Sequence, residues 1–328
     1  IVERDIALDH RRLKAKIAET GITTMFLTTG LFNQHVLTDV GVFAGLKHLL
    51  FGGEAAAGDV IRRLMASAER PRHLIHCYGP TENTTFSLTH EFADVPADGA
   101  PIPIGRDIAN SGSVLVDDTL NPIDGAGQGE LLLSGPGLAL GYFGDAERTG
   151  EKFIRTAWSN EVLYRTGDIV RRLPDGNYVF TGRVDNQVKI RGHRIELEEI
   201  ENVLTTHPAV DGAVILVSED GAGGTKLLSA YLQSASELPP VRQIRAHLAG
   251  KLPAYMIPSR FCQVEQFPLL SMDKVDRAAL AGMQFEALED TDQHTGFTGN
   301  EEVIAEIWAR QLKCSVAAIG PDDSFFDL

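Results

Sequence analysis

The chain has 328 residues, and its 30 Lys and Arg against 45 Asp and Glu give a formal net charge of −15. Its length predicts about two or three domains, and its 43% hydrophobic and 23% charged residues are typical of a globular protein with a sizeable core. The acidic balance excludes a general nucleic-acid binder, which needs basic patches to displace counterions from phosphates.

The cysteines and the start of the chain indicate in which compartment the protein is expected. Cys77, Cys262 and Cys314 are far apart and odd in number, so they predict neither a disulfide framework nor a metal cluster. We therefore expect a reducing, cytoplasmic compartment. No apolar run approaches the ~18–20 residues of a membrane helix, so no membrane partner is expected. The chain begins at Ile1 without a signal pattern, which predicts that it starts inside a longer protein.

The first hundred residues predict a parallel sheet flanked by helices. An amphipathic helix is expected over 9–19, ending at Gly21, and a second over 60–68, capped by Asp59. Strands are expected over 22–27, 46–51 and 73–77. This order is typical of a βαβ unit in an α/β fold.

From about residue 101 the pattern changes to short strands separated by Gly, Pro and Asp turns. Pro174–Asp175–Gly176–Asn177 is a good hairpin turn. We expect a small β-barrel or meander here. Its strands are expected over 113–117, 130–134, 169–173 and 177–181.

The last part of the chain predicts an α+β lobe and then a separate helix. The lobe is expected to contain helices over 195–204 and 241–248 and strands over 210–217 and 226–232. A polar segment that includes 287–298 is expected to be a linker. The final helix, over 300–311, carries an apolar stripe that a short tail cannot bury alone.

Two Gly-containing segments carry groups that suit a nucleotide. Tyr78–Gly79–Pro80–Thr81–Glu82 follows a strand and offers an aromatic face with hydroxyl and carboxylate oxygens for phosphate and Mg²⁺. Tyr164–Arg165–Thr166–Gly167–Asp168 ends in a carboxylate that can accept hydrogen bonds from a ribose. Taken singly, each segment is better explained as an ordinary turn.

Two later segments carry cations. Gly182 to Glu196 places several basic side chains around two glycines at a boundary between lobes, where a hinge could lie. Ser271 to Arg277 contains Lys274 in a polar loop. Taken singly, the first is compatible with a solvated charged hairpin and the second with a surface lysine.

In this order the segments resemble the adenylation domain of nonribosomal peptide synthetases, within the adenylate-forming (AMP-binding) enzymes. Leu252 to Pro258 is typical of the peptide-synthetase branch, and the segment from Asn300 to Leu328 resembles the start of a peptidyl carrier domain. The motifs are Phe51–Gly52–Gly53–Glu54, Tyr78–Glu82, Gly129–Glu130–Leu131 through Gly141–Tyr142, Tyr164–Asp168, Gly182–Glu196 and Lys274–Val275–Asp276–Arg277.

The resemblance implies the adenylate-forming fold, an α/β architecture divided into four parts. Residues 1–183 would be the later part of the large lobe, β-barrel-like from about 100, and 184–286 the small α+β C-terminal lobe. Residues 287–298 would be a linker, and 299–328 a truncated helical carrier (thiolation) domain.

The resemblance also implies a reaction and its residues. An amino acid is activated by Mg²⁺ and ATP as aminoacyl-AMP and then passes to a phosphopantetheine thiol on a carrier domain. Lys274 would be catalytic, and Asp185 would mark the hinge. Thr81 and Glu82 would also serve the metal. The nucleotide-binding positions would be Gly52, Gly53, Tyr78, Gly79, Thr81, Glu82, Asp168 and Arg183.

The implied substrate pocket is mainly apolar, which favours a branched aliphatic amino acid by burial of its side chain. The expected partners are this amino acid, the carrier domain and an upstream condensation domain. The pocket positions are Phe26, Leu50, Gly52, Cys77, Thr85 and Phe86.

Three family elements, two upstream and one downstream, have no match in the sequence. No Gly-rich phosphate loop or substrate-binding Asp precedes Ile22, and the carrier Ser that follows the Phe325–Leu328 motif is missing, since Ser324 precedes it. We therefore expect a fragment of a synthetase that is inactive alone. The alternatives are a non-catalytic interaction remnant, and a free-standing acyl- or aryl-acid ligase that forms CoA thioesters.

Overall fold

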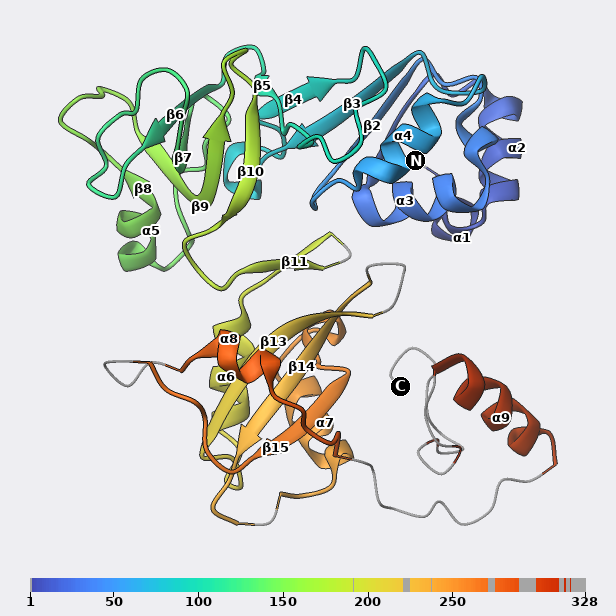
Figure 1. The fold of residues 1–328 in the computed structure, drawn as a ribbon, viewed down its shortest axis with the longest axis vertical. Helices are drawn as coiled ribbons and strands as arrows, with labels where there is room; N and C mark the ends of the chain where they lie inside the picture. The colour runs from blue at the N-terminus through green and yellow to red at the C-terminus, as the bar shows by residue number, and fades with distance from the viewer. Residues whose placement is uncertain are drawn as a thin grey trace. The chain divides into compact units, whose positions relative to one another are not determined.

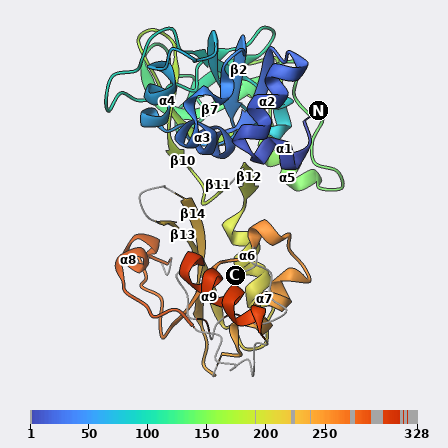
Figure 2. The ribbon, with the colours of Figure 1, turned by 90° about the vertical axis from the view of Figure 1, so that its right-hand side faces the viewer.

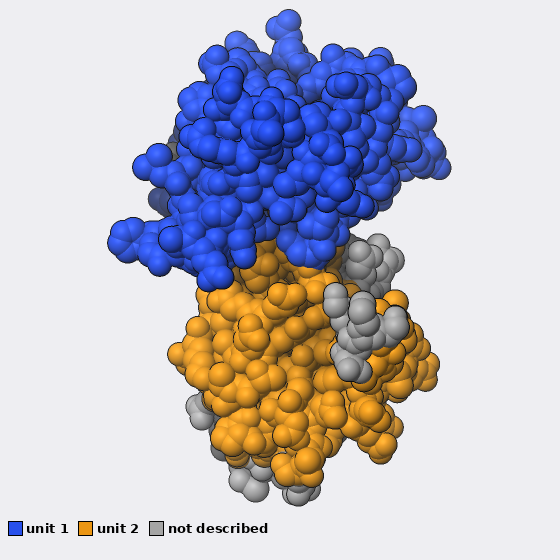
Figure 3. Space-filling model, turned by 90° about the vertical axis from the view of Figure 1, so that its left-hand side faces the viewer, with its two compact units in different colours: residues 1–185, 191–193 blue, residues 186–190, 194–328 orange. Residues whose placement is uncertain are grey.

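The computed structural model describes residues 2–190, 192–220, 225–236, 238–270, 275–288, 299–312, 316 and 319. The chain forms two compact units, which Figure 3 shows in different colours. Unit 1 comprises Ile1–Asp185 and Arg191–His193, and unit 2 comprises Asn186–Ile190 and Arg194–Leu328.

A five-stranded sheet runs through the first part of unit 1. Its order is β1-β2-β3-β4-β5. The first three strands are parallel, which confirms the predicted parallel sheet, and the last two are antiparallel. Their bounds are β1 Thr24–Thr28, β2 His48–Gly52, β3 His73–Tyr78, β4 Leu88–Glu91 and β5 Arg106–Asp107.

Four helices gather beside β2 and β3 (Figure 1). The predicted first helix is confirmed: the Asp9 side chain accepts hydrogen bonds at the start of α2, and Gly21 ends it in a left-handed conformation with φ of +64°. The predicted cap of α4 is wrong, because Asp59 lies inside the first turn, where its charge still favours the helix dipole. The helices are α1 Arg4–Leu8, α2 His10–Thr20, α3 Thr29–Thr38 and α4 Gly58–Met65, with a 3-10 turn at Val40–Phe43.

The core of this region lies between the sheet and the helices. Period-two alternation turns Leu49 and Phe51 of β2 toward the helices, where both are fully buried. Phe51 stacks on Phe32 of α3, with ring centroids 4.2 Å apart. Ile61 and Leu64 bring α4 onto the same cluster.

A second, antiparallel sheet completes unit 1, at the end away from the helices (Figure 1). Its main path is β10-β9-β7-β6, and β8 adds to β9. The bounds are β6 Gly112–Val116, β7 Gly127–Ser134, β8 Phe153–Ile154, β9 Leu163–Arg172 and β10 Tyr178–Arg183, with helix α5 at Ala146–Lys152. Asp175 and Gly176 form the turn of the predicted hairpin between β9 and β10.

Of the two forms expected here, the antiparallel order β6-β7-β9-β10 is a meander, and the barrel is wrong for the residues that the structure describes, because β6 and β10 do not pair with each other. The outer edge of β10 is used by a different segment. The Tyr178 amide donates to the Gly105 carbonyl at 2.9 Å, and the Ile104 amide donates to the Tyr178 carbonyl at 2.8 Å. This contact links the two sheets, so the edge that closure would need is already occupied.

Unit 2 contains a three-stranded sheet packed on two helices, the predicted α+β arrangement. Helices α6 and α7 lie side by side (Figures 1 and 2) and bury Ile200 and Ile244 against the sheet. Arg277 pairs with Glu201 at 2.7 Å. The elements are hairpin β11 Val188–Ile190 and β12 His193–Ile195, α6 Leu197–Thr205, β13 Gly212–Asp220, β14 Thr225–Gln233, α7 Val241–Ala249, η4 Ala254–Met256, β15 Arg260–Val264 and α8 Arg277–Gly282.

Helix α9 (Asn300–Leu312) agrees with the predicted final helix. Ala305 and Ala309 pack against Ile319, while Val303 and Ile307 are about half exposed. Most of the expected linker, 289–298, and most of the segment beyond α9 lie outside the described residues. Within the described part of the chain, no helix has the length and apolar character needed to cross a membrane.

Phe51→Ala should lower the free energy of unfolding by roughly 3–5 kcal/mol, because it removes a fully buried ring and leaves a cavity. Phe143→Ala is the matched control, since the Phe143 side chain is fully exposed and its loss should change stability by less than about 0.5 kcal/mol. Urea unfolding followed by circular dichroism measures both. Equal losses in the two variants would contradict the described core.

Candidate functional site

The segment after β3 forms a tight and strained turn. Gly79 passes so close to the returning chain that a Cβ atom there would lie 2.4 Å from the Thr85 carbonyl oxygen. Thr84 and Thr85 have φ of 49° and 75°, in the left-handed region that residues with a Cβ rarely adopt. The Ser87 amide donates to the Tyr78 carbonyl at 2.8 Å and closes the turn. Strain of this kind is concentrated at functional sites.

This turn is fastened to the segment after β7. The Ala139 amide donates to the Glu82 carbonyl at 2.8 Å, and the Thr84 hydroxyl donates to the Gly137 carbonyl at 2.6 Å. The Tyr142 hydroxyl donates to Oε1 of Glu82 at 2.6 Å. The Glu82 carboxylate therefore has a fixed position, whereas the neighbouring Thr81 is exposed.

A buried charged cluster lies on the other side of Tyr78. Asp168 is 4% exposed, and its carboxylate accepts hydrogen bonds from the Tyr78 hydroxyl and from the Arg183 guanidinium. Arg183 also donates to both carboxylate oxygens of Asp185, at 2.6 and 2.8 Å. Burial, with the negative charge of Asp168 as the second cause, holds the pKa of Tyr78 well above its usual value. The Tyr78 hydroxyl therefore stays a hydrogen-bond donor at neutral pH.

The strand register builds this cluster. β9 and β10 are antiparallel, and Arg183 pairs directly with Asp168 across the ladder. Gly167 has φ of +72°, and a Cβ atom on it would lie 2.8 Å from the Arg183 guanidinium, so only glycine fits there. Tyr164–Asp168, which the sequence made compatible with a turn, lies inside β9, and no local pattern in it indicates that Arg183 faces Asp168.

A second carboxylate, on the neighbouring strand β7, holds the same part of β9. Glu130 of β7 is 7% exposed and binds Arg165 at 2.7 Å. It also accepts a hydrogen bond from the Gly167 amide at 3.2 Å. The Thr166 hydroxyl donates to the Leu131 carbonyl at 2.7 Å. Sequence analysis used Glu130 only as part of a motif; its role in holding the 165–168 strand follows from the structure alone.

The side chains of Tyr78 and Asp168, both expected to contact a nucleotide, contact other protein groups in the structure. The Tyr78 ring, expected to offer an aromatic face to a nucleotide, is 7% exposed and packs in a core cluster with Leu88 and Leu133. The Asp168 carboxylate, expected to meet ribose hydroxyls, is held by protein donors.

The predicted substrate positions lie on one face of the first sheet. Phe26 is in register with Leu50, and Gly52 with Cys77, so their side chains share the face opposite the helical core. Phe86 contacts Phe26 with ring centroids 5.2 Å apart. Gly52 needs to be glycine, because a Cβ atom there would lie 2.1 Å from the Cys77 carbonyl oxygen. The sixth position, Thr85, is exposed in the turn described above.

The other predicted positions are less constrained. Gly53 follows β2 with φ of +98° in open space. Asp185 is the last residue of the main segment of unit 1. Lys274 lies outside the described residues. Among the residues that the structure describes, no group of three or more His, Cys, Asp and Glu side chains could hold a metal ion. The hydroxyl of Thr81 and the carboxylate of Glu82 are hard oxygen donors, which suit Mg²⁺ shared with a phosphate.

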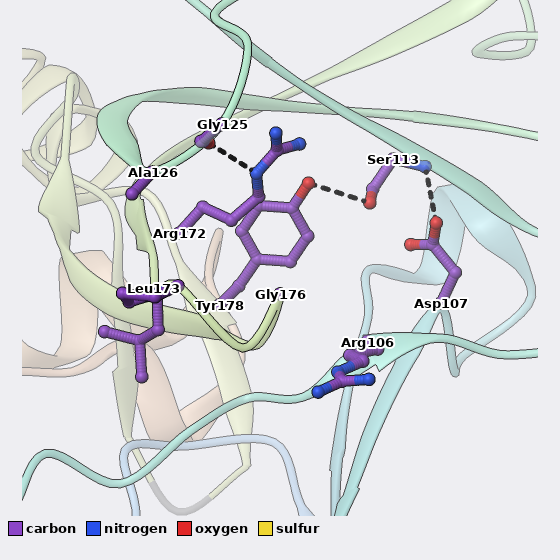
Figure 4. A pocket seen from close by; sticks show the side chains of 10 residues that line it. Arg106, Asp107, Ser113, Gly125, Ala126, Arg172, Leu173, Gly176 and Tyr178 are labelled. Carbon is purple, nitrogen blue, oxygen red and sulfur yellow. Dashed lines mark hydrogen bonds between the residues drawn. The ribbon is translucent and has the colours of Figure 1, made fainter.

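Figure 4 shows a surface hollow of about 440 Å³ elsewhere in unit 1. Its polar groups bond to one another: Arg172 donates to the Gly125 carbonyl at 2.7 Å, and the Ser113 hydroxyl donates to the Tyr178 hydroxyl at 3.3 Å. None of the predicted site positions is among its lining residues.

Comparison with known proteins relates both units to one family. A family model described as AMP-binding enzyme matches residues 1–143, and one described as AMP-binding enzyme C-terminal domain matches residues 199–274. Tyrocidine synthase 3 of Brevibacillus parabrevis is 39% identical over 329 residues, which cover 100% of this chain and 5% of that protein. Surfactin synthase subunit 3 of Bacillus subtilis (strain 168) is 39% identical over 332 residues, which cover 100% and 25%.

Solved structures give the same result for the fold. Holo-PA1221, described as an NRPS protein with adenylation and PCP domains, matches with a TM-score of 0.76 and 32% identity. The match covers 98% of this chain and 52% of that one. The chain therefore spans about half of that protein and a quarter or less of these two synthases.

Asp168→Asn should lower the free energy of unfolding by about 3 kcal/mol, because the buried Arg183 then loses a charged partner but keeps Asp185. Asp5→Asn is the control, since the Asp5–Arg12 pair is more than half exposed and contributes at most about 1 kcal/mol. Urea unfolding compares the two. A loss no larger than that of the control would show that the buried pair does not stabilise unit 1.

Proposed function

The chain belongs to the AMP-binding enzymes, and from this membership we propose that it is the later part of an amino-acid-activating domain of a nonribosomal peptide synthetase. Synthases of tyrocidine and surfactin resemble it over its whole length. The observation that carries the proposal is the arrangement in unit 1, where Tyr78 joins the strained turn after β3 to the buried Asp168–Arg183 pair.

The proposed reaction has two halves. A carboxylate oxygen of the amino acid attacks the α-phosphorus of ATP, and the bond from this phosphorus to the oxygen that bridges to the β-phosphate breaks. Pyrophosphate leaves with the bonding electron pair, and aminoacyl-AMP remains. A phosphopantetheine thiol on a carrier domain then loses its proton, attacks the acyl carbon and releases AMP.

The turn after β3 is the proposed phosphate end of the site. Thr81 and Glu82 are proposed to hold Mg²⁺ together with the phosphates, which matches the preference of this ion for hard oxygen donors. When bound, the ion neutralises charge that develops on the phosphate oxygens. Gly79 supports the assignment because its lack of a side chain lets the chain fold back tightly there.

The Asp168 cluster is the proposed ribose end. A carboxylate with a fixed position can accept two hydrogen bonds from a ribose diol, and Arg183 beside it balances its charge. Tyr78 connects this end to the proposed phosphate end, because its hydroxyl donates to Asp168 and the turn after β3 begins at its backbone. Gly52 and Gly53 are proposed to let the backbone approach the nucleotide, and Asp185 to mark a hinge.

Lys274 is the proposed catalytic cation. Negative charge builds on the non-bridging phosphate oxygens during in-line attack, and a positioned ammonium stabilises that charge more than it stabilises the ground state. A lysine on a long flexible stem can meet the carboxylate of the substrate and the α-phosphate together.

The apolar positions on the open face of β1 and β2 are the proposed substrate pocket. Phe26, Phe86 and Leu50 supply apolar contacts, which favour a branched aliphatic side chain by about 0.8 kcal/mol for each buried CH₂ group. The proposed partners are this amino acid, a carrier domain of which α9 would form the start, and an upstream condensation domain. Unpaired Cys77 and Cys262 are compatible with a reducing cytoplasm.

Lys274→Ala in the full-length protein should abolish amino-acid-dependent exchange of pyrophosphate into ATP, a loss of at least about 100-fold. The reason is the loss of charge stabilisation at the α-phosphate. Lys47→Ala removes an exposed lysine of unit 1 and is the control. Exchange near the parental rate in Lys274→Ala would refute the catalytic assignment.

The substrate profile tests the pocket separately. Valine, leucine or isoleucine should support exchange at least about tenfold better than aspartate or lysine, because an apolar wall cannot solvate a charge. The measurement is exchange with each amino acid in turn at subsaturating concentration. Equal turnover with a charged amino acid would rule out the apolar pocket while leaving the adenylation reaction intact.

A further inference from the structure

We infer that Tyr142 is a positioning residue that sets the orientation of the Glu82 carboxylate. The inference rests on the proposed function, in which Glu82 serves the magnesium ion of the nucleotide. Sequence analysis places Tyr142 only at the end of a motif and gives its side chain no task. The structure supplies the task, because the Tyr142 hydroxyl donates to Oε1 of Glu82 at 2.6 Å across 60 residues of sequence.

The path of the chain around Tyr142 is unusual for a surface loop. Leu140 and Phe143, on either side, are fully exposed apolar side chains, whereas Tyr142 turns inward and is partly buried. Ordinary burial would favour the opposite choice, since Leu and Phe gain more than Tyr from leaving water. The loop therefore leaves the apolar side chains of Leu140 and Phe143 in water, whereas it brings the Tyr142 hydroxyl to Glu82.

Three contacts hold Tyr142, one through its backbone and two through its ring. Its backbone amide donates to the Thr149 hydroxyl at 2.9 Å, and its ring meets Phe153 edge-on at 5.7 Å. The Arg148 guanidinium lies over the ring at 4.9 Å. A donor fixed in this way loses little conformational entropy when it bonds to Glu82, which makes the contact a positioning device.

The direction of this hydrogen bond suits the role. The Tyr142 hydroxyl donates to one defined oxygen, Oε1, of the Glu82 carboxylate at 2.6 Å. A donor on Oε1 restricts rotation of the carboxylate, so that its remaining lone pairs face a constant direction. Groups that orient metal-binding carboxylates typically contribute 10–100-fold to metal affinity or activity.

The test is the Mg²⁺ dependence of amino-acid-dependent ATP–pyrophosphate exchange in the full-length protein. Tyr142→Phe keeps the ring contacts and removes only the hydroxyl. We expect the half-saturating Mg²⁺ concentration to rise about tenfold, with the rate restored by excess Mg²⁺ and the KM for the amino acid unchanged. A merely structural role would lower thermal stability without this selective shift. Tyr178→Phe, the same change at a buried tyrosine far along the sequence, should leave the Mg²⁺ dependence unchanged.

A double-mutant cycle tests whether Tyr142 changes the Mg²⁺ dependence through Glu82. On a Glu82→Gln background, Tyr142→Phe should add less than a twofold further shift, because both changes act on one carboxylate. If Glu82→Gln shifts the Mg²⁺ dependence and Tyr142→Phe does not, the inference about Tyr142 is overturned while the proposed site survives. A full shift by Tyr142→Phe on the Glu82→Gln background also overturns it.

Two further outcomes complete the test. If Glu82→Gln itself leaves the Mg²⁺ dependence unchanged, the proposed metal role of Glu82 fails, and the inference falls with it. If Tyr142→Phe does not fold, Thr149→Val replaces it, since this change removes the hydroxyl that holds the Tyr142 backbone at 2.9 Å. A shift of about threefold or more in the same direction is then expected, and no shift would overturn the inference.

Discussion

Unit 1 is organised around one buried carboxylate. Asp168 is almost completely removed from water, and an ionised carboxylate in that environment costs several kcal/mol unless a charge and hydrogen-bond donors compensate it. Arg183 supplies the charge from the neighbouring strand β10. Tyr78 supplies a donor from the end of β3, in the other sheet and 90 residues earlier in the chain. The need to satisfy this one group therefore ties the two sheets of the unit together.

The position of Tyr78 also determines where the following turn begins. Because its hydroxyl is committed to Asp168 and its carbonyl to the Ser87 amide, residues 79–86 must leave β3 and return beside Tyr78. This requirement explains why Gly79 has no room for a side chain and why Thr84 accepts a left-handed conformation. Hydrogen bonds from the 137–142 segment fasten this strained turn at Glu82 and Thr84.

The first sheet presents two different faces. One face is fully buried beneath the helices through residues such as Phe51 and Leu74. The other carries Phe26, which is 44% exposed, beside the half-buried Leu50. A sheet with one dry face and one partly open apolar face can use the first for stability and the second for binding. In this unit the open apolar positions lie beside the strained turn, since Phe86 of that turn contacts Phe26.

The sequence by itself determined the local elements and the identity of the motifs. Short runs of strand-favouring residues ended by turn residues located β1 to β3, and the motif order identified the family, because both signals lie within short stretches of chain. Only the tertiary structure decided which distant residues contact one another. The register opposes Arg183 to Asp168, Gly105 occupies the β10 edge that a barrel would need, and Tyr142 reaches Glu82. These contacts join residues far apart in sequence, and no local pattern encodes which distant side chain will satisfy a buried polar group.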